Sequence, residues 1–270
     1  VDRARRVLRE VENITNLSRE LKGEQTGTLS IATTHTQARY VLPEVIQAFS
    51  ERYPKVDLEL HQGTSEQIAE LINTHQVDFA IASGSRKLFG NLKVLPIYQW
   101  DRIALVPKGH ELALDKRELT LQTLAAFPLV TYVFSLTGES SFKQAFQAEG
   151  LDPRVAFTAR DADIIKTYVR MGMGVGIIAS MAYECQDQED LKAIDATGLF
   201  PRITTWLGFP RDMVLRSYML DFIHLFAPHL PLGIIREAAK AETPEALEEL
   251  LGDVELPVRG GCPEDSAAAA

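Results

Sequence analysis

Short apolar segments alternate with amphipathic segments along most of the chain, and this alternation is the strongest constraint on the fold. The segments at 28–33, 77–83 and 175–180 read as strands, and helical patterns lie between them. The segment at 77–83 is apolar at nearly every position, as expected of a strand with both faces covered. Strands that alternate with helices are typical of α/β architecture with largely parallel sheets. The strand–helix run occurs about twice, before and after residue 98, so the pattern predicts two α/β lobes with a cleft between them.

Length and charge exclude several classes of protein. The 270 residues suffice for one large or two modest domains, and no apolar run approaches the roughly 18 residues of a membrane helix. Residues 1–22 hold six Lys/Arg against four Asp/Glu, and residues 237–270 hold two against nine, within a net charge of −9. An acidic body is a poor nucleic-acid binder by itself. Because the chain begins with Val1 and shows no leader, we expect a piece of a longer protein.

The two cysteines, Cys185 and Cys262, show no metal or redox spacing. Free thiols in a reducing compartment are the favoured interpretation, and one disulfide is the alternative. The six histidines show no metal-ligand spacing either, so we expect neither a metal nor a cofactor.

Residues 1–22 have apolar residues at heptad-like spacing and are expected to form a helix that ends at Gly23. Two interpretations stay open. The helix packs on its own domain, or it is a linker that pairs with a second copy of the chain.

The turn after the first predicted strand is unusually polar. It reads Thr33-Thr34-His35-Thr36-Gln37, where a turn usually uses Gly, Asn, Asp or Pro. At the carboxyl end of a parallel strand, such hydroxyl and amide donors face the crevice where ligands bind. Thr34, Thr36 and Gln37 therefore suit a small oxyanion. Helix capping is the alternative, but it needs one hydroxyl and this turn offers several.

Similar residues follow other strands. Ser83 closes the strand at 77–83, and Ser135 and Thr137 precede a predicted helix. We expect these residues to converge on the cleft of a two-lobed fold, where the indole N–H of Trp100 is a further donor. Each of these positions is also compatible with an ordinary turn, cap or core residue.

Other motifs favour structural roles. "MGMGVG" at 171–176 follows a helix and precedes a strand, the reverse of a dinucleotide fingerprint, so it predicts a tight turn. Asp161 and Asp163 could perform acid–base work, but aspartate at a helix start favours capping. No nucleophile with its base is recognisable, so we expect no catalytic residue.

The specific segments resemble a known family. "GTLSIATTHTQARYVLPEVIQAFSERYP", "QGTSEQIAE" and "DADIIKTYVRMGMGVGIIASMA" are similar to the effector-binding domain of LysR-type transcriptional regulators, in the subgroup of CysB and Cbl. The resemblance runs from about Gly27 to Leu230. It implies an α/β fold of two Rossmann-like subdomains joined by two crossover strands, like type 2 periplasmic binding proteins.

The resemblance also implies a function, the regulation of sulfur assimilation and cysteine biosynthesis by a cytoplasmic homodimer or homotetramer. The effector would be sulfate, thiosulfate, O- or N-acetylserine, or adenosine phosphosulfate. DNA would be bound only through an N-terminal winged helix-turn-helix that this chain does not contain. The implied ligand-binding residues are Thr34, Thr36, Gln37, Ser83, Trp100 and Thr137, with His35, Ser135 and Asp163 as possible supporting residues.

The implied domain boundaries are 1–23 for the linker and dimerisation helix, 24–98 with 204–230 for the first subdomain, 99–203 for the second, and 231–270 for C-terminal helices and tail. The alternative function is a solute-binding protein for a small oxyanion. A third interpretation is an enzyme that uses His35, Asp161 or Asp163.

Overall fold

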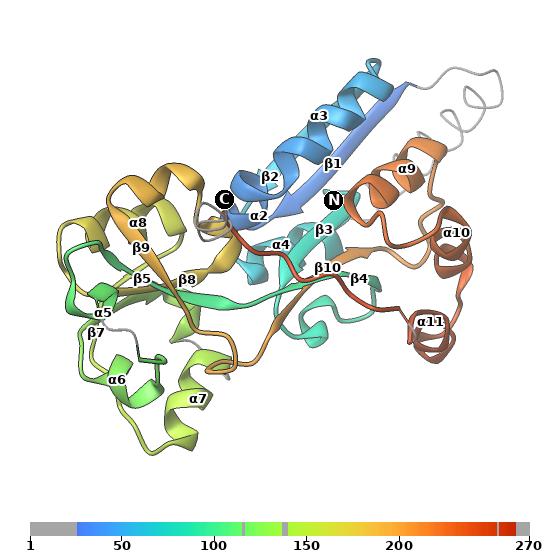
Figure 1. The fold of residues 1–270 in the computed structure, drawn as a ribbon. Coiled ribbons are helices and arrows are strands. Elements are labelled where there is room, and N and C mark those ends of the chain that lie inside the picture. Colours follow the sequence, from blue (N-terminus) through green and yellow to red (C-terminus); the bar gives the residue numbers. More distant parts are fainter. Residues whose placement is uncertain (1–25, 115–116, 137–139, 253, 263–270) are drawn as a thin grey trace, which may run out of the picture. The chain divides into compact units, whose positions relative to one another are not determined.

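The computed structural model describes residues 26–114, 117–136, 140–252 and 254–262, and the chain divides into two compact units (Figure 1). Unit 1 comprises residues up to 98 and 204–257, and unit 2 comprises residues 99–203 and the segment from 258. The helix expected at 1–22 lies outside the described residues. The segment expected as a separate C-terminal part is divided, because its helices belong to unit 1 and residues 258–262 to unit 2.

Unit 1 contains a five-stranded mixed sheet in the order β2-β1-β3-β10-β4. The strands are β1 (Gly27–Thr33), β2 (Val56–Gln62), β3 (Phe79–Ser83), β4 (Lys93–Trp100) and β10 (Ile203–Phe209). β1 pairs in parallel with β2 and β3, whereas β10 runs antiparallel to β3. The carboxyl ends of β1 and β3 therefore share one edge of the sheet with the beginning of β10.

The helices of unit 1 follow the capping and proline signals of the sequence. They are α2 (His35–Tyr40), α3 (Leu42–Arg52), α4 (Ser65–Asn73), η1 (Arg86–Phe89), α9 (Ser217–Phe226), α10 (Leu232–Lys240) and α11 (Pro244–Leu251). Pro43 lies in the first turn of α3, so the helix after β1 stops and restarts there, as predicted. The capping box of α4 is confirmed, because the Thr64 hydroxyl and the Gln67 amide each bind the other's backbone N–H.

Unit 2 contains a second five-stranded mixed sheet, in the order β7-β6-β8-β5-β9. Its strands are β5 (Arg102–Pro107), β6 (Leu129–Tyr132), β7 (Val155–Ala159), β8 (Val175–Ala179) and β9 (Leu191–Asp195). β6 is parallel to β7 and β8, and β5 is antiparallel to β8 and β9. The sheets were expected to be largely parallel, and each is instead mixed, because antiparallel strands complete it.

The helices of unit 2 are α5 (Glu111–Leu114), α6 (Leu121–Ala125), η2 (Val133–Ser135), α7 (Ser141–Ala148), α8 (Ala162–Arg170), η3 (Ser180–Ala182) and η4 (Cys185–Glu189). α8 packs on β5, β6 and β8. The glycines after α8 make the predicted tight turn. Gly174 has φ of +155°, and a Cβ there would lie 2.2 Å from the Pro128 carbonyl oxygen, so only glycine fits.

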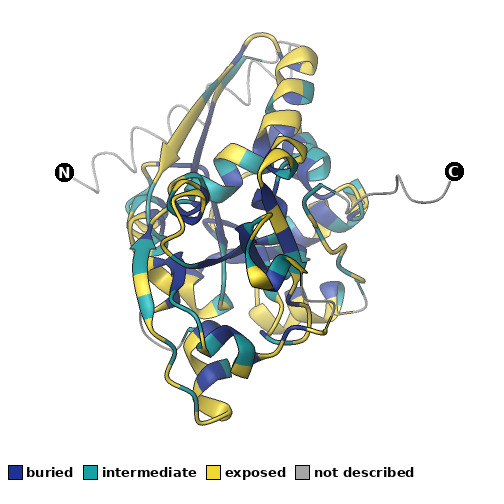
Figure 2. Cartoon of the chain, turned by 60° about the vertical axis from the view of Figure 1, so that its left-hand side comes forward, coloured by how far each residue is buried: buried dark blue, intermediate teal, exposed yellow. Residues whose placement is uncertain are grey.

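Burial follows the inner strands of the sheets, such as β3 and β8, whereas the edge strand β2 is mostly exposed; Figure 2 shows buried segments in dark blue and exposed ones in yellow. Each unit has apolar clusters of its own. Phe142, Phe146 and Phe200 pack together in unit 2, and Phe49, Phe79 and Phe222 pack in unit 1. No helix among the described residues is both long enough and apolar enough to span a membrane.

The expectation of free thiols is wrong, because Cys185 and Cys262 form a disulfide. The C-terminal segment brings them together. The Arg259 N–H donates to the Gln99 carbonyl oxygen at 2.8 Å, and the Cys262 N–H donates to the Tyr183 carbonyl oxygen at 2.9 Å. The two cysteines are 77 residues apart in sequence, so their spacing gave no sign of this pairing.

Candidate functional site

The carboxyl-terminal edge of the unit 1 sheet holds most of the sequence-predicted residues of that unit. Thr33 ends β1, Thr34 is the N-cap residue of α2, and Ser83 ends β3. The Thr34 side chain makes no capping hydrogen bond. The Thr34 hydroxyl is therefore not used to cap α2, so helix capping does not explain the polar residue at this position.

Gln37 of α2 and Ser83 at the end of β3, two of the predicted site residues, are in direct contact. Gln37 is buried, and its Nε2 donates to the Ser83 Oγ at 3.1 Å. The Tyr98 hydroxyl donates to the Gln37 Oε1, and the Ser83 Oγ shares a 2.8 Å hydrogen bond with the Thr205 Oγ1. This hydroxyl–amide network fixes the orientation of the Gln37 amide, whose Nε2 carries a second N–H.

Tyr98 and Thr205 were not found by sequence reasoning. Thr205 lies opposite Ser83 in the antiparallel pair of β10 and β3. It is 122 residues away in sequence, so no local pattern could associate the two hydroxyls. Tyr98 lies in the mostly apolar strand β4, which concealed its polar contact with Gln37.

Two polar atoms at this edge of unit 1 are buried without a hydrogen-bond partner among the described residues. They are the Thr33 Oγ1 and the His35 Nδ1. Buried polar atoms in folded proteins are nearly always hydrogen-bonded, so each such exception needs an explanation. A bound ligand whose polar atoms hydrogen-bond to these two groups is one such explanation. Thr36 and His35, in the first turn of α2, are half-buried.

In unit 2, Trp100 is 3% exposed and lies at the end of β4, next to the start of β5. Ser135 is fully buried, and its Oγ accepts a hydrogen bond from the Thr131 Oγ1 at 3.2 Å. Its carbonyl oxygen accepts one from the Ser140 hydroxyl. Ser135 is thus held within the turn between β6 and α7, whereas Thr137 lies outside the described residues.

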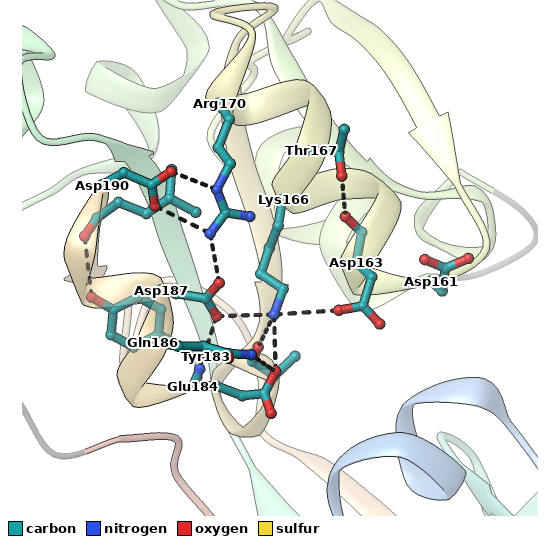
Figure 3. A network of polar contacts seen from close by, with 12 residues as sticks. Asp161, Asp163, Lys166, Thr167, Arg170, Tyr183, Glu184, Gln186, Asp187 and Asp190 are labelled. Atoms are coloured by element: carbon teal, nitrogen blue, oxygen red, sulfur yellow. Dashed lines mark hydrogen bonds and ion pairs between the residues drawn. The ribbon is translucent and has the colours of Figure 1, made fainter.

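The aspartates of the "RDADIIK" segment have structural contacts. Asp161 is the N-cap of α8, and its carboxylate accepts a hydrogen bond from the Ile164 N–H at 2.8 Å, so the predicted capping role is confirmed. An Asp163 oxygen lies 3.4 Å from the Lys166 Nζ (Figure 3). Asp163 is therefore engaged by a cation of its own helix.

Lys166 is the centre of a charge network that joins α8 to η4 (Figure 3). Its Nζ is 2.9 Å from an Asp187 oxygen and 3.5 Å from a Glu184 oxygen, and Arg170 binds the other Asp187 oxygen at 2.8 Å. Burial raises the pKa of Asp187, but the Glu184 N–H and the two cations outweigh burial, and the net pKa lies below the ordinary aspartate value. The network joins α8 to η4, and carboxylates of the same unit pair with both of its cations.

Two shallow hollows of unit 2 lie away from these residues. One, of about 170 Å³, is lined by Leu112, Leu119, Thr120 and neighbouring side chains. The other lies between α6 and the end of α7. Neither contains a buried charge or a sequence-predicted site residue, so neither is a better candidate than the sheet edges.

Comparison with known proteins assigns the fold and the family. Residues 22–231 match the family model described as the LysR substrate binding domain. Over 253 residues the chain is 43% identical to the HTH-type transcriptional regulator CysB of Haemophilus influenzae, covering 94% of this chain and 78% of that protein. It is 42% identical over 237 residues to the HTH-type transcriptional regulator SsuR of Burkholderia cenocepacia, covering 86% and 77%.

Among solved structures, the cofactor-binding domain of the Cbl transcriptional regulator is similar, with a TM-score of 0.73 and 40% identity. The similarity covers 80% of this chain and 95% of that domain. The predicted fold class is confirmed, since the two mixed α/β sheets match effector-binding domains of the type 2 periplasmic-binding-protein-like fold.

Proposed function

The chain belongs to the LysR substrate-binding domain family, and from this premise we propose that it senses a small oxyanion as the regulatory domain of a transcriptional regulator. The observation that carries the proposal is the hydroxyl–amide network of Gln37 and Ser83, next to the half-buried Thr36. Neutral donors of this kind bind an oxyanion through directed hydrogen bonds. The solute-binding alternative has weaker support, because the relatives reported above are named as transcriptional regulators.

The chemical class of the effector follows from the donors and from the subgroup. Sulfate and thiosulfate offer several acceptor oxygens around a small centre, and the acetylserines and adenosine phosphosulfate carry an acidic group of similar size. The resemblance to CysB and Cbl supports an output in sulfur assimilation and cysteine biosynthesis as part of this proposal. Thr34, Thr36, Gln37, Ser83, Trp100 and Thr137 are the proposed ligand-binding residues, with His35, Ser135 and Asp163 supporting them.

The proposed mechanism is a shift of population, without a chemical reaction. An effector changes the equilibrium between two arrangements only by binding one of them more tightly than the other. In the intact cytoplasmic homodimer or homotetramer, this preference would alter how the DNA-binding modules are presented. The net charge of −9 agrees with DNA being bound by another module.

Substitution of Thr36 tests the proposal. We expect T36A to weaken sulfate or effector binding by roughly 1–3 kcal/mol, because one donor to the ligand is lost. The measurement is isothermal titration calorimetry with sulfate, thiosulfate, both acetylserines and adenosine phosphosulfate. T74A is the matched control, since Thr74 is a C-cap residue of α4 whose hydroxyl binds the Glu70 carbonyl oxygen. Equal affinities for wild type and T36A would remove Thr36 from the site, and no binding of any of these ligands would contradict the proposed function.

A further inference from the structure

Arg102 is a buried cation that the sequence did not single out. It is the first residue of β5 and is 3% exposed. Its Nη1 donates to the Ser141 Oγ at 3.0 Å, and its guanidinium carbon lies 5.4 Å from the ring centre of Phe200 and 6.0 Å from that of Trp100. Its Nε is buried and has no hydrogen-bond partner within the part of the chain that the structure describes.

The charge of Arg102 lacks a counter-ion among the described residues. Burial lowers its pKa to about 10, which still leaves the group protonated at neutral pH, and Tyr132 acts in the opposite direction. Buried charges in proteins are ordinarily paired, because an isolated charge loses its hydration without compensation. A guanidinium in this environment is therefore suited to an anion that comes from outside the chain.

The position of Arg102 in the sheet is that of a ligand-binding residue. Arg102 pairs with Ala179, the last residue of β8, and the parallel strand β6 ends at Tyr132 along the same edge. Ligands of open α/β sheets bind outside the carboxyl ends of the parallel strands. The antiparallel direction of β5 is what brings its first residue to this edge.

The first turn of α7 meets the guanidinium at this edge. Ser141 begins α7, and the Ser140 hydroxyl caps the helix by accepting from the Lys143 N–H at 3.2 Å. The N-terminus of a helix carries a partial positive charge that favours anions. The guanidinium, the Ser141 hydroxyl and the start of α7 are thus three features that attract negative charge, and they lie together within unit 2.

We propose that Arg102 and Ser141 form an oxyanion subsite in unit 2 that binds the acidic group of the effector. The proposal rests on the proposed function for the identity of the occupant, and it adds a charged residue to a set of ligand-binding residues that is otherwise neutral. A planar guanidinium offers its N–H groups in a fork that fits two oxygens of one carboxylate or sulfate group. The buried Nε is the atom whose environment such a ligand changes.

A direct test follows the Arg102 Nε–H resonance in ¹⁵N-labelled wild-type protein. The signal is assigned by its absence from R102K. Sodium sulfate is added at constant ionic strength, with sodium chloride as the reference, and N-acetylserine in a separate titration. We expect a saturable shift of the Arg102 signal with both oxyanions and none with chloride. The Nε–H signal of Arg86, which pairs with Glu248 in unit 1, serves as the internal control.

The second test compares affinities by calorimetry. We expect R102M to lower the affinity for sulfate and for N-acetylserine at least tenfold, and R102K to lie between R102M and wild type because it keeps the charge and loses the fork. R154M, at an exposed position of unit 2, is the matched control and should bind as wild type does. Circular dichroism and thermal unfolding report whether each variant folds.

The outcomes separate this inference from the proposed function. If T36A weakens binding while R102M binds as wild type and the Arg102 signal stays unmoved, the subsite is overturned and the proposed function stands. If wild type binds none of the oxyanions, the proposed function fails and the subsite loses its occupant. The resonance is measured on wild type, so the test remains decisive even if R102M does not fold.

Discussion

Two buried cations of unit 2 have opposite surroundings, although each is 3% exposed. The Lys166 Nζ lies within 3.5 Å of oxygens of Asp163, Glu184 and Asp187, and it also donates to the Ala182 carbonyl oxygen at 3.1 Å. Arg102 has one hydroxyl partner at 3.0 Å and, among the described residues, no carboxylate. The two cations are thus equally buried, but carboxylates neutralise the charge of Lys166 and none of the described carboxylates neutralises that of Arg102.

This difference separates a structural charge from a charge that is suited to a ligand. The carboxylates around Lys166 come from α8, η4 and the turn before η4, so the network fixes these segments to one another (Figure 3). The surroundings of Arg102 are aromatic rings and one serine, which position the guanidinium without neutralising it. Burial alone does not distinguish the two roles, whereas the identity of the partners does.

Methionine substitutions of the two cations should give the largest contrast. K166M removes one of the two cations that contact the buried Asp187 among the described residues and leaves Arg170, and we expect it to lower the free energy of unfolding by about 3–5 kcal/mol. R102M leaves no buried carboxylate behind, and without ligand we expect a change within about 1 kcal/mol. Urea unfolding of the two variants measures both values. Equal losses would show that Arg102 is also a structural charge.

Loss of the disulfide tests whether the charge network of Lys166 fixes η4 by itself, because Cys185 and Asp187 both lie in η4. The bridge closes a loop across 77 residues, so we expect its loss in C262S to lower the free energy of unfolding by about 2–4 kcal/mol. The charge network should still hold η4, so hydrogen exchange should become faster in 258–262 and stay slow in α8. Faster exchange throughout α8 would mean that the bridge, and not Lys166, fixes this region. C185S should match C262S.

Low pH should reduce the stability difference between wild type and K166M, and this is the smallest of the expected effects. The pKa of Asp187 is lowered in the folded protein, so its ionised form stabilises the fold above the ordinary aspartate pKa, and this contribution is lost as pH falls through the folded value. The difference in unfolding free energy between wild type and K166M should therefore narrow from pH 7 to about pH 3. R102M should follow the wild-type curve. A constant difference for K166M would show that Asp187 contributes no pH-dependent stability.

Local features were predictable because their partners lie a few residues away. The caps at Thr64 and Asp161, the interruption at Pro43 and the glycine turn after α8 depend on neighbours in the chain, and the structure confirms each. The donors that follow β1 and β3 were also visible, since the end of a strand can be read from the pattern. Conversely, β9 was not predicted, because Leu191–Asp195 is short and weakly patterned.

By itself, the sequence determined the α/β class, the order of most elements and the concentration of neutral donors after the first strand, because these depend on periodicity and on contacts within one or two turns. Only the tertiary structure decided that Thr205 meets Ser83, that Cys262 meets Cys185, and that Lys166 is neutralised while Arg102 is not. The physical reason is that the partner of a buried group is set by strand order and by chain crossings between distant segments. The residue type alone shows that a buried polar group requires a hydrogen-bond or ion-pair partner. The packing of distant segments determines whether the chain provides that partner.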